Sequence, residues 1–267
     1  MGDVLFEHAD VLLERQDTIA RLRLRRKSAL NALSSAFFDT LDAAIDALDA
    51  AEGVRAVILM SDVPKAFIAG ADISEMKGKT AAEMETYARR GQRFMARIEQ
   101  HPAIWVAAVN GYCLGGGFEV ALSCDLIAAG PRATFAFPEI GLGLLPGFGG
   151  TQRFTRSAGM HAGLRYILTG ERFGADTATA LGLVWIAPGE DEDFDEVVGG
   201  AVEKAFGNVA SVAAREVKRV VRAATWLSLE DGCDAEAAAF GAIGNSADAV
   251  EGLTAFLEKR KPEFRGN

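Results

Sequence analysis

Short apolar runs alternate with amphipathic stretches along the first half of the chain. Residues 21–25 alternate Arg and Leu with a period of two, which predicts a half-buried strand. Continuous apolar runs predict further buried strands, which cover residues 56–60, 104–109 and 126–129. Apolar residues at helical spacing predict helices, which cover residues 39–50, 80–99 and 117–123. Buried strands separated by helices indicate an α/β fold with parallel strand pairing.

The pattern changes after about residue 190, where Asp191, Glu192 and Asp193 form a polar connection. Ala, Val, Glu and Lys then dominate, and no further strand is predicted. Residues 198–258 predict three or four helices, an arrangement that often mediates oligomer contacts. We therefore expect a core over residues 1–197 and a helical region over residues 198–267.

Composition and charge exclude several classes of protein. The chain has 267 residues, enough for one large domain or for one domain with an appendage. Its net charge of −9 argues against nucleic acid as a partner, although a local basic patch could still bind a small anion. Cys113, Cys124 and Cys233 are odd in number and lack metal-ligand spacing, so we expect reduced thiols and no metal site.

No apolar run approaches the length of a membrane span, so no membrane partner is expected. The N-terminal residues lack the basic and apolar regions of a signal peptide, and we expect a cytoplasmic protein. His8, His101 and His161 have no evident partners in the sequence. A serine hydrolase would need a G-x-S-x-G turn at its nucleophile, and none occurs.

Glycine is concentrated in one part of the chain. Ten of the 29 glycines lie between Gly111 and Gly150, which indicates sharp bends or close backbone contacts. Gly115, Gly116 and Gly117 follow a predicted strand and begin a predicted helix, where free N–H groups and the helix dipole favour an anion. Close packing of this helix on a strand would require the same glycines. The small residues of the segment 65–73 permit the same two interpretations. They could leave N–H groups unpaired at a cleft, or they could allow the loop to pack tightly against the sheet.

Two carboxylates lie in apolar surroundings. Glu139 is the only charged residue between Arg132 and Arg153, and Glu119 lies between Phe118 and Val120. Such a carboxyl is a candidate for a raised pKa and for acid–base chemistry, whereas a helix cap or an ion pair is the structural alternative. Two of them beside a possible oxyanion cradle favour the chemical role.

These segments, taken in order, resemble the enoyl-CoA hydratase/isomerase (crotonase) family over essentially the whole chain. The matching motifs are AFIAGADI at 66–73, GGGFE at 115–119 and PEIGLGLLPGFGGTQR at 138–153. Supporting matches lie at residues 31–33, 171–172, 180–184 and 255–262. The resemblance implies a spiral of repeated strand–strand–helix units, followed by C-terminal helices that build trimers, often paired into hexamers.

The resemblance also implies roles for individual residues. The N–H groups of Ala71 and Gly116 would form the oxyanion hole for a thioester carbonyl. Glu119 and Glu139 would be the catalytic carboxylates, and Gly147 would help to hold the attacking water. We expect Glu119 to activate this water and Glu139 to deliver the proton to C2 of the substrate.

Substrate binding is implied at two further places. Residues that would line the CoA path are Ala69, Gly70, Ala71, Asp72, Ile73 and Gly116. Contacts to the CoA phosphates and adenine are expected in the segment 26–29, notably at Lys27 and Ala29. Lys27 departs from the proline that relatives usually carry. Lys261 could reach CoA phosphates in the same or a neighbouring subunit, or belong to a solvated basic tail.

The leading hypothesis is an enoyl-CoA hydratase that takes a CoA thioester as substrate and needs no cofactor. An enoyl-CoA isomerase or another acyl-CoA enzyme of the family is the first alternative. A non-catalytic scaffold that binds CoA or RNA is an alternative of a different class. Retention of both Glu119 and Glu139 argues against the scaffold, and the acidic charge argues against RNA.

Overall fold

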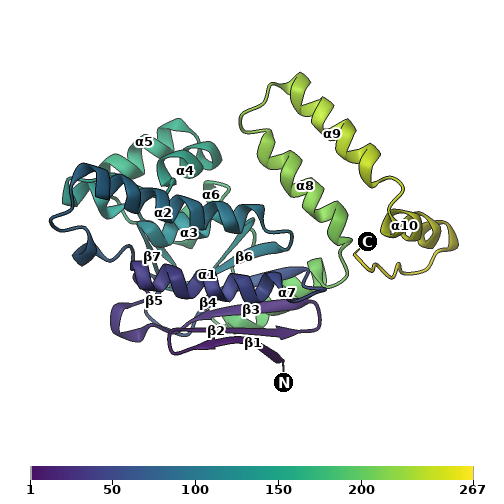
Figure 1. The fold of residues 1–267 in the computed structure, drawn as a ribbon, viewed down its shortest axis with the longest axis horizontal. Coiled ribbons are helices and arrows are strands. Elements are labelled where there is room, and N and C mark those ends of the chain that lie inside the picture. Colours follow the sequence, from purple (N-terminus) through teal and green to yellow (C-terminus); the bar gives the residue numbers. More distant parts are fainter. Residues whose placement is uncertain (1, 267) are drawn as a thin grey trace.

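Six strands form a mixed sheet in the computed structural model, which describes residues 2–266 (Figure 1). The strands are β1 (Asp3–His8), β2 (Val11–Gln16), β3 (Ile19–Leu24), β4 (Ala56–Ser61), β6 (Ile104–Val109) and β8 (Leu126–Ala129). β1, β2 and β3 form an antiparallel meander, and β3, β4, β6 and β8 pair in parallel. The predicted parallel core is therefore confirmed.

A second sheet of three short parallel strands stands beside the first. It contains β5 (Ala66–Ile68), β7 (Tyr112–Leu114) and β9 (Thr134–Ala136). Each of these strands directly follows a strand of the large sheet, in the pairs β4–β5, β6–β7 and β8–β9. Helices α2 (Ala81–Gln100), α3 (Gly116–Ser123) and α4 (Gly150–Ala158) follow the three pairs in turn. The chain thus repeats a strand–strand–helix unit, as the family resemblance implies.

The large sheet is covered on both faces because its central strands are apolar on both faces. Val57 and Leu59 of β4 belong to the main core, together with residues of α2, α3 and α1 (Ser35–Asp49). Ile58 and Met60 point to the opposite face and pack against α7 (Phe194–Phe206). This alternation follows the period of two along a strand.

The N-terminal hairpin was not predicted from the sequence. β1 is an edge strand whose six residues are exposed or only half-buried, so it lacks a clear apolar alternation. The predicted half-buried strand at residues 21–25 is present as β3, which begins earlier, at Ile19. Leu22 and Leu24 are buried there, and Arg21 and Arg23 are partly exposed.

The C-terminal part is helical, as expected. After α5 (Met160–Thr169) and α6 (Ala175–Ala180), the described chain forms α7, α8 (Ser211–Ala223), α9 (Leu229–Ile243) and α10 (Ala247–Glu258). α9 and α10 stand away from the sheets, and α8 connects them to the core side (Figure 1). The expected boundary at residue 197 falls inside α7, which packs on the large sheet. Within residues 2–266, no helix is long and apolar enough to cross a membrane.

Candidate active site

Two backbone N–H groups lie unpaired at the ends of neighbouring strands of the small sheet. Gly116 is the first residue of α3, where a helical N–H has no partner within its own helix. The two neighbours of Ala71 bond Leu33, because Leu33 N–H donates to Gly70 O and Asp72 N–H donates to Leu33 O, both at 2.8 Å. The Ala71 N–H therefore points away from Leu33. Within residues 2–266, neither Ala71 N–H nor Gly116 N–H donates a hydrogen bond.

Glycines bring these two groups close together. A Cβ atom on Gly117 would lie 2.2 Å from the carbonyl oxygen of Ile68, so α3 contacts the backbone of β5 directly. A Cβ atom on Gly70 would lie 3.6 Å from Leu114 O. The segment that carries Ala71 and the turn that carries Gly116 are thus adjacent. Gly117 permits the close packing, and Gly116 presents an N–H group without a partner.

The Glu119 side chain is buried within the core, with 1% of its surface exposed. Its Oε1 atom accepts hydrogen bonds from Phe148 N–H at 2.8 Å and from Gly150 N–H at 2.6 Å. The pKa of Glu119 is raised from 4.5 to about 7, because burial, together with the charge of Glu139, outweighs the opposing effect of the two N–H donors and of Arg153. The donors engage Oε1 and leave Oε2 available for another partner.

The Glu139 carboxyl lies against the glycine turn that precedes α3. Glu139 belongs to the short 3-10 helix η3 (Pro138–Leu142), and its Oε2 atom is buried without a hydrogen-bond partner. A Cβ atom on Gly115 would lie 2.5 Å from Glu139 Oε1, and Gly115 has a φ of +48°. Burial raises the pKa of Glu139 from 4.5 to about 7. Neither an ion pair nor a cap within the described chain explains this buried carboxyl.

The loop before α4 forms one side of the site. Gly147 lies in this loop, and its carbonyl oxygen accepts a hydrogen bond from Gln92 Nε2 at 2.9 Å. Phe148 packs against Tyr87 with ring centroids 5.5 Å apart. Tyr87 O–H donates to Leu33 O at 3.2 Å, and burial and the nearby carboxylates of Glu75, Asp72 and Glu119 raise its pKa.

Sequence reasoning missed the contributions of Phe148, Gly150 and Tyr87. The site uses the backbone N–H groups of Phe148 and Gly150, which no side-chain pattern reveals. Tyr87 contacts Leu33 across 54 residues of sequence, and only the tertiary fold brings them together. A Cβ atom on Gly91 would lie 2.1 Å from the Phe148 ring, so a glycine inside a predicted helix was the one available signal.

Residues expected to bind CoA lie partly beside this site. Lys27 and Ala29 form the short helix η1 (Lys27–Ala29), and Ala69 N–H donates to Leu30 O at 3.0 Å. The segments 26–29 and 69–73 are therefore neighbours. Asp72 caps the short helix η2 (Ile73–Glu75), because its Oδ1 atom accepts a hydrogen bond from Ser74 N–H at 3.1 Å.

Lys261 lies elsewhere in this chain. The adjacent Pro262 accepts a hydrogen bond at its carbonyl oxygen from Asn208, beyond the end of α7. The carbonyl of Phe264 accepts a hydrogen bond from Arg55, which precedes the start of β4. Ala69 and its neighbours follow the opposite end of β4, so Lys261 is not brought to the CoA residues of its own chain.

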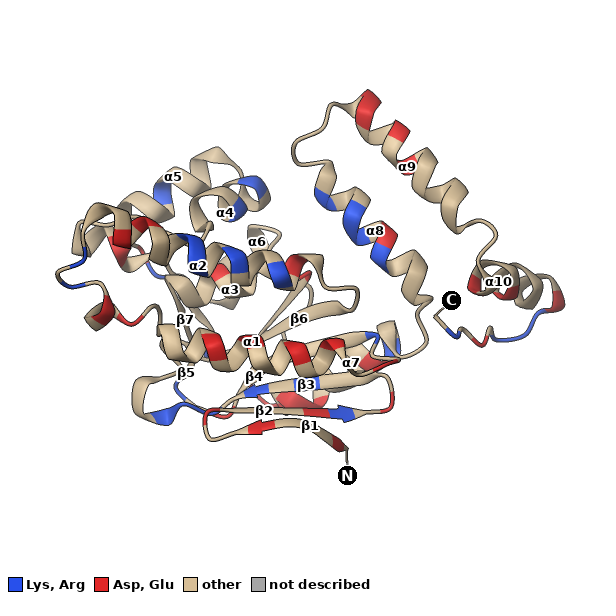
Figure 2. Ribbon diagram, in the orientation of Figure 1, with Lys and Arg blue, Asp and Glu red and all other residues tan. Residues whose placement is uncertain are grey.

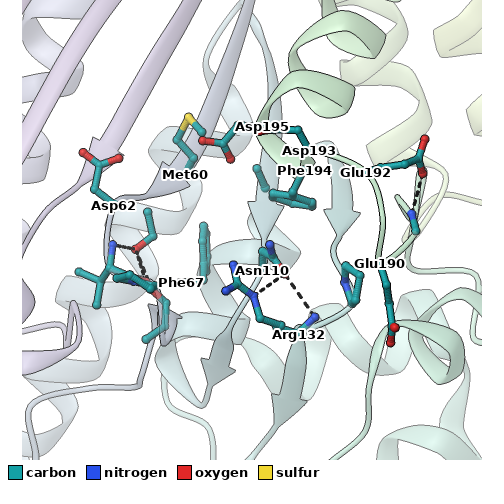
Figure 3. Close-up of a pocket in the computed structure, with 17 residues that line it drawn as sticks. Met60, Asp62, Phe67, Asn110, Arg132, Glu190, Glu192, Asp193, Phe194 and Asp195 are labelled. Atoms are coloured by element: carbon teal, nitrogen blue, oxygen red, sulfur yellow. Dashed lines mark hydrogen bonds between the residues drawn. The ribbon is translucent and has the colours of Figure 1, made fainter.

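A separate pocket of about 800 Å³ opens at the carboxyl ends of β4 and β6 (Figure 3). None of the expected site residues lines it. Its lining carries one arginine and several acidic side chains, namely Arg132 with Asp62, Glu190, Glu192, Asp193 and Asp195. This acidic lining disfavours a ligand with phosphate groups, which would be repelled.

Comparison with known proteins agrees with this fold. The family model described as enoyl-CoA hydratase/isomerase matches residues 14–267. A short-chain-enoyl-CoA hydratase of Clostridium acetobutylicum is 38% identical over 254 residues, which cover 95% of this chain and 97% of that protein. A mitochondrial enoyl-CoA hydratase of Pongo abelii is 38% identical over 94% of this chain and 85% of its own length.

A solved structure shows the same architecture. The crystal structure of an enoyl-CoA hydratase from Bacillus anthracis superposes with a TM-score of 0.90 and 30% sequence identity, and the match covers 97% of this chain and 100% of that one. The chain therefore belongs to the enoyl-CoA hydratase/isomerase family and has the crotonase fold. It is a crotonase-family acyl-CoA enzyme.

Proposed function

We propose that the protein is an enoyl-CoA hydratase, which adds water across the C2=C3 bond of a 2-trans-enoyl-CoA to give the 3-hydroxyacyl-CoA. One observation carries the proposal: two unpaired N–H groups and two carboxyls with raised pKa values, one buried and one half-buried, lie around the same glycine turn. The hydratase names of relatives at 38% identity support it.

The two N–H groups of Ala71 and Gly116 suit the charge that this reaction develops. When water attacks C3, negative charge moves to the thioester oxygen and forms an enolate. Two fixed donors stabilise that charge more strongly than the neutral carbonyl, and loss of one such donor typically costs about 10²–10³ in rate. The positive end of the α3 dipole acts in the same direction.

Glu119 and Glu139 suit the two proton transfers. Two N–H donors at Oε1 favour the carboxylate form of Glu119, which accepts a proton from water as the oxygen bonds to C3. Glu139, whose Oε2 atom is buried without a donor, favours the protonated form and delivers its proton to C2. One proton then returns from Glu119 to Glu139 and restores the pair. Each transfer is worth about 10²–10⁴ in rate.

The assembly of the molecule is part of the proposal. Large apolar side chains of α9 and α10 are exposed in the single chain, among them Phe240, Leu253, Phe256 and Leu257. Their exposed fractions reach 81% at Phe256, which is unusual for a monomer and favours self-association. We propose a trimer or a dimer of trimers, in which Lys261 serves the CoA of a neighbouring subunit.

A direct assay tests the proposed reaction. Crotonyl-CoA loses the ultraviolet absorbance of its conjugated thioester on hydration, so the purified protein should cause an absorbance decrease. Glu119→Gln and Glu139→Gln should each retain CoA binding and lose at least 10²-fold in kcat. Glu52→Gln, at an exposed position, should leave kcat unchanged.

No absorbance decrease with enoyl-CoA substrates of four to sixteen carbons would refute the hydratase proposal. Conversion of a 3-enoyl-CoA without hydration would instead favour the isomerase.

A further inference from the structure

The orientation of the Glu119 carboxylate depends on the loop 146–150, whose conformation needs contacts from other elements. Both donors to Glu119 Oε1 come from the loop 146–150, in which Gly149 has a φ of +110°. Glycine permits the sharp bend at this φ, but it also loses more conformational entropy on folding than any other residue. The loop therefore needs contacts from other elements to keep the Phe148 and Gly150 N–H groups directed at the carboxylate.

Arg153 of α4 supplies such a contact. Its Nη1 atom donates to the carbonyl oxygen of Phe148 at 2.9 Å, so it holds the residue whose N–H holds Glu119. A Cβ atom on Gly149 would lie 2.2 Å from the same nitrogen, so the guanidinium lies directly on the bend of the loop. The Arg153 side chain is only 19% exposed, which limits screening by water.

Glu99 fixes the guanidinium itself. Arg153 Nε and Nη2 donate to the two carboxylate oxygens of Glu99, each at 2.8 Å. This paired geometry defines both the position and the plane of the guanidinium, which a single contact would not. Glu99 stands near the end of α2, so the arrangement anchors the loop to the long helix of the first strand–strand–helix unit.

A cluster of charged side chains, which includes Arg153, Glu99 and Arg222, also contacts α3, the helix that carries Glu119. Arg222 of α8 donates to Glu99 Oε1 at 3.0 Å and to the carbonyl of Ser123, the last residue of α3, at 3.1 Å. Arg222 also pairs with Asp125 at 2.9 Å, and Lys218 pairs with the same carboxylate at 2.8 Å. Both belong to the basic residues along α8 (Figure 2). The loop and the helix that meet at Glu119 are therefore tied to one cluster.

We propose that Arg153, fixed by Glu99, is a positioning residue that holds the loop 146–150 so that Phe148 and Gly150 fix the Glu119 carboxylate for water activation. The inference rests on the proposed function for its kinetic consequence. Its structural consequence, the state of Glu119, holds whatever the reaction. The charged or titratable groups that act on Glu119 are Glu139 of η3, Arg153 of α4 and Tyr87 of α2.

Substitution of Arg153 separates charge from geometry. Arg153→Gln should lower kcat about 10- to 100-fold while KM for crotonyl-CoA stays within about threefold, because a displacement near 1 Å can cost 10² in rate. Loss of the positive charge should also raise the pKa of Glu119 and move the rising limb of kcat/KM to higher pH. Arg153→Lys keeps the charge and loses the paired geometry, so the limb should return only in part, because the Phe148 and Gly150 donors are held less firmly, and kcat should stay reduced.

Glu99→Gln is the second variant and predicts the opposite pH effect. It weakens the same anchor, so kcat should fall, but it removes a negative charge from the cluster, so the rising limb should move to lower pH. Arg89→Gln is the matched control, since Arg89 also bonds a glutamate, Glu85, but on the exposed face of α2. It should leave kcat and the pH profile unchanged.

A readout besides turnover keeps the inference separate from the proposed function. The carbon-13 carboxyl signal of labelled Glu119, assigned with Glu119→Gln, reports its pKa in each folded variant. A Glu119 pKa that stays partly raised in Arg153→Lys, where the charge is kept, supports the positioning role even if crotonyl-CoA is not hydrated. Unchanged kcat and an unchanged Glu119 titration in folded Arg153→Gln would overturn it. Should that variant fail to fold, unchanged values in Glu99→Gln would have the same effect.

Discussion

Gly117→Ala should separate α3 from β5 and so open the proposed oxyanion hole. The added Cβ would lie 2.2 Å from Ile68 O and 2.9 Å from the carbonyl carbon of the same residue. These are backbone atoms, which no rotamer change can move aside. Because ordinary contacts begin at about 3.4 Å, the helix and the strand must move apart by about 1.2 Å.

This displacement acts on the Gly116 N–H, one residue away. A donor at about 2.9 Å from the thioester oxygen would move beyond about 3.5 Å, where a hydrogen bond is lost. We therefore expect kcat for crotonyl-CoA to fall about 10²–10³-fold. Overpacking of this kind should also lower the free energy of unfolding by about 1–3 kcal/mol.

Crotonyl-CoA hydration and urea denaturation measure the two effects. Gly200→Ala is the matched control, because Gly200 lies on α7 with nothing within 4 Å of an added Cβ. That control should keep full activity and gain up to about 1 kcal/mol from its higher helix propensity. A folded Gly117→Ala protein with kcat within threefold of the unmodified protein would refute the link between this packing contact and catalysis.

Three further predictions follow from burial and exposure. Glu139→Gln should raise the free energy of unfolding on the order of 2 kcal/mol at pH 8.5 and hardly at pH 4. Folding raises the pKa of Glu139 from 4.5 to about 7, so its destabilising effect is absent below pH 4.5, grows between pH 4.5 and 7 and is complete above pH 7. Equal effects in urea titrations at both pH values would contradict this. Asn31→Ala should cost about 3 kcal/mol in the same assay, since its buried amide donates to Ser61 Oγ and Phe67 O, both at 2.8 Å. Phe256→Arg should shift the protein toward monomer in analytical ultracentrifugation, and an unmodified protein that is itself monomeric would refute the proposed assembly.

The longer elements of the fold were predictable from local pattern. The apolar runs that predicted β4, β6 and β8 match the structure to within a residue or so, because these strands are buried on both faces. The strands β5, β7 and β9 have three residues each, too few for any periodicity, and they became expected only through the family resemblance.

The catalytic side chains of the proposed site could be predicted from the sequence, whereas the backbone groups that position them could not. Glu119 and Glu139 stood out because a carboxyl in an apolar segment is unusual. The structure buries Glu119 and leaves Glu139 half-buried, with its Oε2 atom buried. The hydrogen bonds from Phe148 and Gly150 could not be predicted, since they arise where a loop folds back across 29 and 31 residues of sequence. Arg153 is the last residue of the motif matched at 138–153, but its pairing with Glu99, which lies 54 residues away, could not be predicted.

The alternation of the chain between the two sheets sets the width of the proposed oxyanion hole. Ala71 and Gly116 follow β5 and β7, which are adjacent parallel strands, and such strands lie about 4.8 Å apart. Two donors at that separation can each reach one oxygen at about 2.9 Å, with an angle of about 110° between the two bonds. The spacing is thus a property of the backbone repeat, and it can persist while most side chains change. The fold itself is shared with a structure at 30% sequence identity.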